Sequence, residues 1–315
     1  MILFSADITS NLQKQLMEAN PDQEFIFYKN MEAARTKLPE AEVLVTYGED
    51  LTDELIKEAV SLKWIMVISA GLEKMPLQAI RERGILVTNA RGIHSIPMAE
   101  YAISMILQVY RKNRQLVEYE KANEWAHHLS MDELHGKTMV ILGAGAIGQE
   151  VARLAKAFHV KTIGVSRSGT PVASFDEVYS INALNSLLPQ ADIFISILPS
   201  TDKTRGMLRY DNLAALPEHA IFMNLGRGDV IATNDILRAV NEEQIAHAVL
   251  DVFEEEPLPA GHSLWDHEFI TVTPHISSRS KHYEARALEI FQKNLMIYGK
   301  EKQDYVNKID LTRGY

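Results

Sequence analysis

The sequence predicts an α/β fold made of two doubly wound domains, each with a parallel sheet. Three observations support this prediction. Short apolar runs alternate with helical patterns, 315 residues are enough for two domains of ordinary size, and 46% of the residues are apolar without any low-complexity block. Alternation of strands and helices is typical of a parallel sheet that is covered by helices on both faces.

The first 100 residues contain five apolar runs of strand length, with helical patterns such as SNLQKQLMEAN and TDELIKEAV between them. The runs are MILFSA, EFIFYK, EVLVTYG, KWIMVISAG and GILVTNA. A helical pattern from Ser95 to Tyr119 follows, with Pro97 in its first turn and apolar residues on most of its sides. A helix of this kind is buried between layers or domains, so we expect it to lead into a second domain.

The second half of the chain contains six more strand-like runs separated by helical stretches, the pattern of a doubly wound dinucleotide-binding domain. The runs lie in GKTMVILGAG, KTIGVSRSG, ADIFISILPS, AIFMNLGRG, IAHAVLDVF and FITVTPHIS. A long helical pattern, SRSKHYEARALEIFQKNLMIYGK, then leads the chain back to the first domain. We therefore predict a discontinuous domain of residues 1–97 and 282–315 and an inserted domain of residues 98–281.

Composition excludes several classes of function. A net charge of −10 and a pI of about 5.6 argue against a nucleic-acid surface, which needs a basic face. The chain has no cysteine, which excludes disulfides, Cys-ligated zinc and thiolate catalysis, and we predict no metal site. No apolar run approaches the length of a membrane span, and the start MILFSADITSN lacks a basic segment followed by an apolar one. We therefore expect a cytoplasmic protein without membrane contact.

The turn GAGAIG has G-x-G-x-x-G spacing, with Gly143, Gly145 and Gly148 around Ala146 and Ile147. It follows a strand-like run and opens a helical pattern, a context that favours a dinucleotide site over an incidental turn. The first glycine permits a tight turn, the second lets the backbone approach a pyrophosphate, and the third lets helix and strand pack closely. The N-terminus of the helix then faces the phosphates.

The next strand-like run ends in Ser166, Arg167 and Ser168, where a dinucleotide-binding domain often places an acid. A carboxylate there accepts hydrogen bonds from the ribose hydroxyls and repels a 2′-phosphate. Hydroxyl groups and a guanidinium instead suit a phosphate monoester. We predict that NADP(H) is preferred, with NAD(H) as the alternative if Arg167 is only a solvated loop residue.

Three charged residues follow strand-like runs of the second domain: Arg227 after AIFMNL, Glu256 after AHAVLDVF and His275 after FITVTP. Open α/β sheets bind ligands beyond the carboxyl ends of their strands, so we expect the three side chains to meet. A guanidinium can bind and polarise a 2-oxo acid, and a protonated imidazole can donate a proton to the developing alkoxide. A carboxylate beside the imidazole orients it and favours its charged form.

Each of these residues also has a structural alternative. The segment GRG can be a simple turn, and Glu254 to Glu256 can be a solvated charge run. Other histidines compete with His275 for the catalytic role, namely His94, His127, His128 and His267.

The order of LGAGAIG, ILPSTDKTRGM, NLGRGDVI, LDVFEEEPLP and TPHIS resembles the D-isomer-specific 2-hydroxyacid dehydrogenase family over essentially the whole chain. The resemblance implies a Rossmann cofactor domain inserted in a flavodoxin-like substrate-binding domain, with a cleft between them. It assigns catalysis to the family's Arg, Glu and His, which match Arg227, Glu256 and His275. It further assigns substrate carboxylate binding to the backbone N–H groups of Ala70, Gly71 and Leu72, the nicotinamide carboxamide to Asp251, and cofactor contacts to Pro199 and Thr204.

Within that family, EPLP, HSLWDHEFITVTPHI and the terminal TRGY are most similar to the glyoxylate/hydroxypyruvate reductases. The resemblance thus implies NADPH-dependent reduction of a small anionic 2-oxo acid to the 2-hydroxy acid, by a homodimer. Either the apolar helix near residues 97–110 and the segment around Trp125 form its contacts, or these regions are internal core. Two alternatives stay open: an NAD-dependent D-2-hydroxyacid dehydrogenase for larger 2-oxo acids, and a nucleotide-sensing, corepressor-like binding protein. His94 and Met98 either shape the pocket or pack at the start of a helix.

Overall fold

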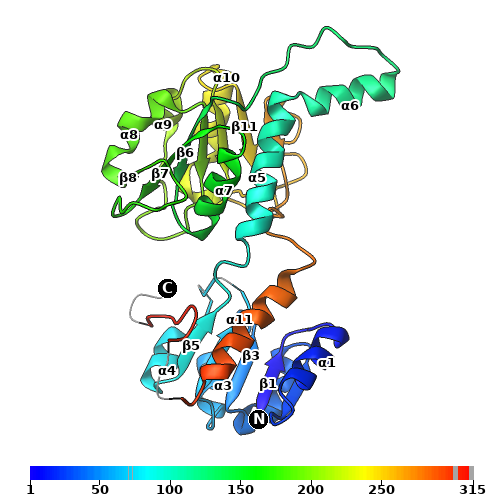
Figure 1. Ribbon diagram of the computed structural model, residues 1–315, viewed down its shortest axis with the longest axis vertical. Coiled ribbons are helices and arrows are strands. Elements are labelled where there is room, and N and C mark those ends of the chain that lie inside the picture. The colour runs from blue at the N-terminus through cyan, green and yellow to red at the C-terminus, as the bar shows by residue number, and fades with distance from the viewer. Residues whose placement is uncertain (70, 73, 301–303, 312–315) are drawn as a thin grey trace. The chain divides into compact units, whose positions relative to one another are not determined.

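The structure is a computed structural model that describes residues 1–69, 71–72, 74–300 and 304–311. The chain divides into two compact units, Met1–Ile93 with Ser280–Tyr315 and His94–Arg279 (Figure 1). Each unit consists of a parallel sheet flanked by helices, as predicted. The chain crosses between the units at 93/94 and 279/280, whereas the sequence placed the boundaries at 97/98 and 281/282.

The first unit contains a five-stranded parallel sheet with the order β2-β1-β3-β4-β5, and all five runs predicted as strands form it. The central strands are buried throughout because α1 and α11 cover one face and α2, η1, α3 and α4 cover the other. The strands are β1 Ile2–Ser5, β2 Phe25–Tyr28, β3 Val43–Thr46, β4 Trp64–Val67 and β5 Leu86–Asn89. The helices are α1 Ser10–Ala19, α2 Met31–Ala34, η1 Arg35–Glu40, α3 Asp53–Glu58, α4 Leu77–Glu82 and α11 Tyr283–Ile297.

The second unit contains a seven-stranded parallel sheet with the order β12-β11-β10-β9-β6-β7-β8. Six of these strands are the predicted ones, and the seventh, β8, was missed. It is a four-residue edge strand, Glu177–Ser180, with exposed and half-buried side chains, so it contains no apolar run. The other strands are β6 Thr138–Leu142, β7 Lys161–Ser166, β9 Ile193–Ser196, β10 Ile221–Asn224, β11 His247–Leu250 and β12 Ile270–Val272.

Helices cover both faces of this sheet. On one face α5 and α7 pack against β6, β9, β10 and β11, and on the other lie α8, α9 and α10. The helical pattern from Ser95 to Tyr119 forms two helices rather than one, because Lys112 takes a left-handed conformation with φ 53°. The second of them, α6, projects from the body of the unit (Figure 1). The elements are α5 Ser95–Tyr110, α6 Asn113–Ala122, α7 Ala146–Lys156, η2 Ile181–Ala183, α8 Leu184–Leu187, η3 Leu188–Gln190, α9 Tyr210–Ala214, η4 Gly228–Val230 and α10 Thr233–Asn241.

Among the helices that the structure describes, none combines the length and the apolar character needed to cross a membrane.

A buried histidine lies at the start of β11. His247 is 8% exposed, and its Nε2 lies 2.9 Å from the Oγ1 of Thr271. Burial is the main cause that lowers the pKa of His247 to about 4, and the positive charges of Arg114, His267 and Lys112 lower it further. The imidazole is therefore neutral in the folded protein near neutral pH.

We expect acid to destabilise the protein through His247. The unfolded chain binds a proton at the ordinary histidine pKa of 6.5, whereas the folded chain does so only at about 4. The contribution of neutral His247 to the free energy of unfolding is therefore fully present above the pKa of the unfolded chain. It declines as the pH falls, by about 3 kcal/mol near pH 4. His247→Gln keeps a polar group toward Thr271 and has no such proton to gain. Urea unfolding near neutral pH and near pH 4 should show a smaller acid loss in this variant, while the exposed His128→Gln should retain the full loss.

Candidate active site

The predicted site residues of the second unit lie at the carboxyl ends of six neighbouring strands. Because the sheet is parallel, these ends share one edge. From β7 to β12 the edge carries Ser166 to Ser168, the glycine turn, the Pro199–Thr204 segment, Arg227, Glu256 and His275. Neighbouring strands are about 4.8 Å apart, so this row spans about 24 Å.

Two glycines of the turn are required by the packing of the protein itself. Gly143 has φ 117°, and a Cβ atom there would lie 2.7 Å from the carbonyl oxygen of Ile197. A Cβ atom at Gly148 would lie 2.2 Å from the carbonyl oxygen of Gly143. Both distances are far below a normal contact, so only glycine lets β6 turn directly into α7.

The third glycine is different. A Cβ atom at Gly145 would meet no described protein atom within 4 Å, so internal packing does not require glycine there. Gly145 is the N-cap residue of α7, and no described side chain caps this helix. The N–H groups of Ala146 and Ile147 have no carbonyl one turn earlier to bond to. An open approach, first-turn N–H groups and the positive end of the helix dipole fit the pyrophosphate of a dinucleotide.

The end of β7 lies beside this turn, since the Val165 carbonyl accepts the N–H of Gly143 at 2.9 Å. The half-buried Ser166 accepts the Gly169 N–H at Oγ, 3.1 Å away. The exposed Ser168 has its Oγ 2.7 Å from the Oγ1 of Thr170. Arg167 is also exposed. The three predicted side chains thus lie beside the glycine turn, and their contact with a ribose stays a prediction.

Pro199 and Thr204 lie after β9 and are joined by a hydrogen bond. Thr204 Oγ1 donates to the Pro199 carbonyl at 2.5 Å and accepts the Thr201 N–H at 2.9 Å. The hydroxyl of Thr204 therefore shapes its own turn, and its contact with a cofactor stays a prediction.

Arg227 lies between two glycines at which the chain makes very close contacts. A Cβ atom at Gly226 would lie 2.4 Å from the Leu198 carbonyl oxygen, and one at Gly228 would lie 1.9 Å from the Phe253 carbonyl carbon. GRG is thus more than a simple turn, because it brings Arg227 between the segments that follow β9 and β11. The guanidinium bonds its own chain through Nη1, which donates to the Gly226 carbonyl at 2.9 Å.

Glu256 and His275 form a direct pair. Glu256 Oε2 lies 2.7 Å from His275 Nδ1, and its other oxygen accepts the Phe253 N–H at 2.9 Å. The side chain of His275 is 43% exposed and that of Glu256 is 35% exposed. A carboxylate only accepts hydrogen bonds, so Nδ1 is the donor and Nε2 is the ring nitrogen that can exchange a proton with a substrate.

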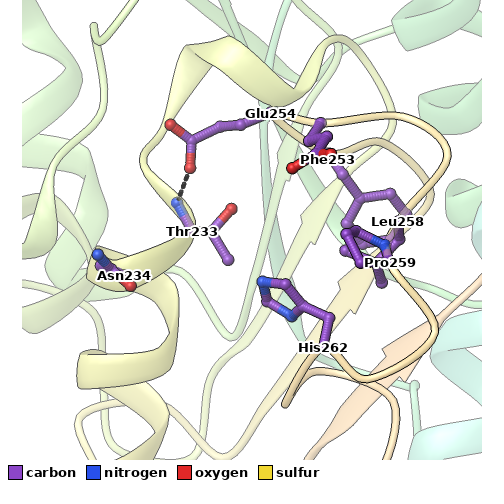
Figure 2. A pocket seen from close by; sticks show the side chains of 8 residues that line it. Thr233, Asn234, Phe253, Glu254, Leu258, Pro259 and His262 are labelled. Atoms are coloured by element: carbon purple, nitrogen blue, oxygen red, sulfur yellow. Dashed lines mark hydrogen bonds between the residues drawn. The ribbon is translucent and has the colours of Figure 1, made fainter.

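The three consecutive glutamates have three different environments. Glu254 Oε2 accepts the Thr233 N–H at 2.5 Å at the start of α10, as Figure 2 shows. Glu255 is exposed, as expected of a solvated charge run. Glu254, Glu255 and His262 are among the residues that line a cavity of about 210 Å³, and Glu256 is not. The cavity in Figure 2 is therefore separate from the Glu256–His275 pair.

Asp251 is fully buried, at 0% exposure. Its Oδ1 accepts the hydroxyl of Thr273 at 2.6 Å and the N–H of Ile276 at 2.9 Å, and its Oδ2 accepts the Ser277 N–H at 2.9 Å. The carboxylate thus holds the loop that carries His275. These bonds gave no signal in the sequence, which assigned Asp251 to the nicotinamide only by resemblance; that contact stays a prediction.

His94 and Met98 lie at the start of α5. Met98 is 6% exposed and packs in the core beside α7. His94 is half-buried, and its pKa is lowered chiefly by burial and also by the positive charge of Arg227, against a raising effect of a hydrogen bond with the Ser278 backbone. The charge of Arg227 therefore acts on His94, whereas Met98 is a packing residue.

The remaining predicted residues belong to the first unit, after β4. Leu72 is 5% exposed and packs in the core of that unit, so only its backbone could contact a substrate. The Gly71 carbonyl accepts the Ser69 hydroxyl at 3.2 Å. Ala70 lies outside the described residues.

Comparison with known proteins places the chain in a family. Residues 103–277 match the family model of the D-isomer specific 2-hydroxyacid dehydrogenase, NAD binding domain. A glyoxylate reductase of Aeropyrum pernix is 32% identical over 288 residues, which cover 88% of this chain and 86% of that protein. The crystal structure of a D-isomer specific 2-hydroxyacid dehydrogenase family protein from Aeromonas salmonicida has a TM-score of 0.87 at 33% identity, with 98% of both chains covered.

An NADPH-dependent glyoxylate/hydroxypyruvate reductase from Sinorhizobium meliloti, solved in complex with NADP and sulfate, has a TM-score of 0.82 at 25% identity. That match covers 100% of this chain and 99% of the other. The family model spans more than half of the sequence, and the relatives match nearly all of it. The chain belongs to the D-isomer specific 2-hydroxyacid dehydrogenase family of oxidoreductases.

Proposed function

We propose that this protein reduces a small 2-oxo acid of the glyoxylate or hydroxypyruvate type to the 2-hydroxy acid, with NADPH as the preferred reductant. The observation that carries the proposal is the Glu256–His275 pair, with its 2.7 Å hydrogen bond at the edge where the glycine turn also lies. The names of the relatives from Aeropyrum pernix and Sinorhizobium meliloti support the substrate class.

The position of the pair matters as much as its geometry. His219 and Asp192 form a second imidazole–carboxylate pair, also at 2.7 Å. They lie just before β10 and β9, at the amino ends of the strands, where open α/β sheets do not bind ligands. Only the pair at the carboxyl edge can meet a ligand that is held by the glycine turn.

In the proposed mechanism, Arg227 binds the carboxylate of the substrate and polarises its carbonyl group. A bound nicotinamide cofactor supplies the hydride that the carbonyl carbon accepts. His275, protonated on both nitrogens, gives the Nε2 proton to the carbonyl oxygen, which becomes the hydroxyl group. Glu256 holds Nδ1–H throughout, so the imidazole keeps one orientation before and after the proton leaves.

The end of β7 supports the preference for NADPH. Ser166, Arg167 and Ser168 offer two hydroxyl groups and a guanidinium, and none of them is a carboxylate that would repel a 2′-phosphate. The relative from Sinorhizobium meliloti is NADPH-dependent by name.

His275→Gln should lower kcat for reduction by about 10²–10⁴-fold, because the side-chain amide cannot donate the proton. Steady-state kinetics with glyoxylate and hydroxypyruvate would measure this. His219→Gln is the matched control, since it breaks the other imidazole–carboxylate pair and should leave kcat unchanged. Near-normal turnover of the His275 variant would refute its role as proton donor.

The wild-type kinetics also separate the alternatives. Faster turnover of 2-oxoisocaproate with NADH than of glyoxylate with NADPH would indicate a dehydrogenase for larger substrates. Binding of either nucleotide without turnover of any 2-oxo acid would indicate a nucleotide-sensing protein.

Arg167→Asp should lower kcat/KM for NADPH by about 10- to 100-fold, because it replaces a charge-assisted contact with repulsion of the 2′-phosphate. The value for NADH should stay equal or rise. Arg81→Asp, at an exposed arginine of α4, makes the same change of net charge far along the chain and should alter neither value. An unchanged NADPH/NADH ratio in the Arg167 variant would show that the cofactor preference is set elsewhere.

We further propose a homodimer that forms through α6 and the segment after it. α6 has no buried residue in the described chain, and Leu116, Val117 and Trp125 are 38%, 45% and 91% exposed. A ten-residue helix is marginal in water unless its apolar side is packed against something. A second copy of the chain would cover these side chains.

Sedimentation of the purified protein should therefore give the mass of two chains of 35.5 kDa each. Trp125→Asp should shift the equilibrium toward the monomer, since it would bury a charge in the interface. Val60→Asp, at an exposed apolar residue of the first unit, should leave it dimeric. A monomeric wild type at micromolar concentration would contradict the proposal.

A further inference from the structure

A half-buried chain of hydrogen bonds joins helix α5 to the loop of His275. The hydroxyl oxygen of Tyr101 lies 2.6 Å from Thr273 Oγ1, which lies 2.6 Å from Asp251 Oδ1. Tyr101 and Thr273 are 172 residues apart in the sequence. None of the chemistry assigned above uses Tyr101.

The direction of these bonds follows from the chemistry of the groups. Thr273 Oγ1 donates its single hydroxyl proton to Asp251 Oδ1. The oxygen of Thr273 then accepts from Tyr101, which must be the donor. Burial raises the pKa of Tyr101 to about 12, so its hydroxyl keeps its proton at any working pH.

The chain of bonds ends on both sides of His275. Asp251 binds Thr273 before the histidine and the N–H groups of Ile276 and Ser277 after it. The His275 N–H itself donates to the Asp251 carbonyl at 2.9 Å. His275 has φ 50°, a left-handed conformation that is unfavourable for a residue with a Cβ atom. The conformation therefore has to be held by its surroundings.

We propose that Tyr101 is a positioning residue for His275, which it orients through Thr273 and Asp251. Tyr101 donates to Thr273 and so keeps the Thr273 hydroxyl turned toward Asp251. The carboxylate then keeps three donors of the loop in place, and the loop presents the imidazole to Glu256. This proposal rests on the proposed role of His275 as the proton donor.

Tyr101→Phe removes one oxygen atom and should lower kcat by about fivefold to tenfold, with KM for the 2-oxo acid nearly unchanged. Tyr110→Phe is the matched control. Tyr110 is a second tyrosine of α5 with a buried hydroxyl, and that hydroxyl has no hydrogen-bond partner among the described residues. Its removal should leave kcat unchanged. Urea unfolding of both variants would verify that each is folded.

Thr273 gives a second test through rescue. Thr273→Val keeps the shape but removes the hydroxyl from a bond to a charged group, and should lower kcat by about 30-fold. Thr273→Ser keeps the hydroxyl and should restore most of the rate. Equal losses in the Val and Ser variants would show that only the packing of Thr273 matters, and would overturn the hydrogen-bonded connection.

A double-variant cycle identifies the residue through which Tyr101 acts. In a His275→Gln background, Tyr101→Phe should cause no further loss of kcat, because the group it positions is already gone. A further fivefold to tenfold loss there would show that Tyr101 acts by another route and would overturn the proposal. The proposal would also be overturned if the single Tyr101→Phe variant had the kcat of the wild type while His275→Gln was inactive. If His275→Gln itself keeps full activity, the proposed role of His275 as proton donor is wrong. That outcome is distinct from a failure of the proposed role of Tyr101, in which His275→Gln loses activity and Tyr101→Phe does not.

Discussion

The loop that carries His275, the proposed proton donor, depends on one buried carboxylate. Asp251 follows β11 directly and is removed from water, which is costly for a charge unless donors surround it. Those donors come from the loop around His275, which follows the neighbouring strand β12. The buried carboxylate is satisfied only when the loop supplies these donors, and the loop keeps its conformation only when the carboxylate accepts them. This mutual dependence sets the position of the imidazole.

The register of the sheet places the other predicted site segments at the same edge as the His275 loop. One lateral row of paired residues crosses six strands, and the functional segments begin directly after it. The segments predicted to bind the phosphates and ribose of the cofactor follow β7, β6 and β9, and those with the proposed catalytic residues follow β10, β11 and β12. The row consists of Val165, Leu142, Ser196, Asn224, Leu250 and Val272.

Most of the fold could be predicted because strands of a parallel sheet are buried on both faces and appear as apolar runs. The edge strand β8 could not, since its side chains are exposed or half-buried. The row of Arg227, Glu256 and His275 could be predicted because each residue follows such a run. The contacts of Asp251 and Tyr101 could not, since they join residues 22 to 172 positions apart and depend on how the strands are ordered.

The backbone of His275 shows why a dedicated network is needed at this point of the fold. Glycine would adopt φ 50° at little cost, but it has no imidazole. A histidine in this conformation costs about 1–2 kcal/mol, and its N–H must be paired with the carbonyl groups of Asp251 and Thr273 to stay there. The hydrogen bonds of Asp251 therefore do more than compensate for a buried charge. They also hold the residues on both sides of a histidine whose backbone conformation is unfavourable for a residue with a Cβ atom.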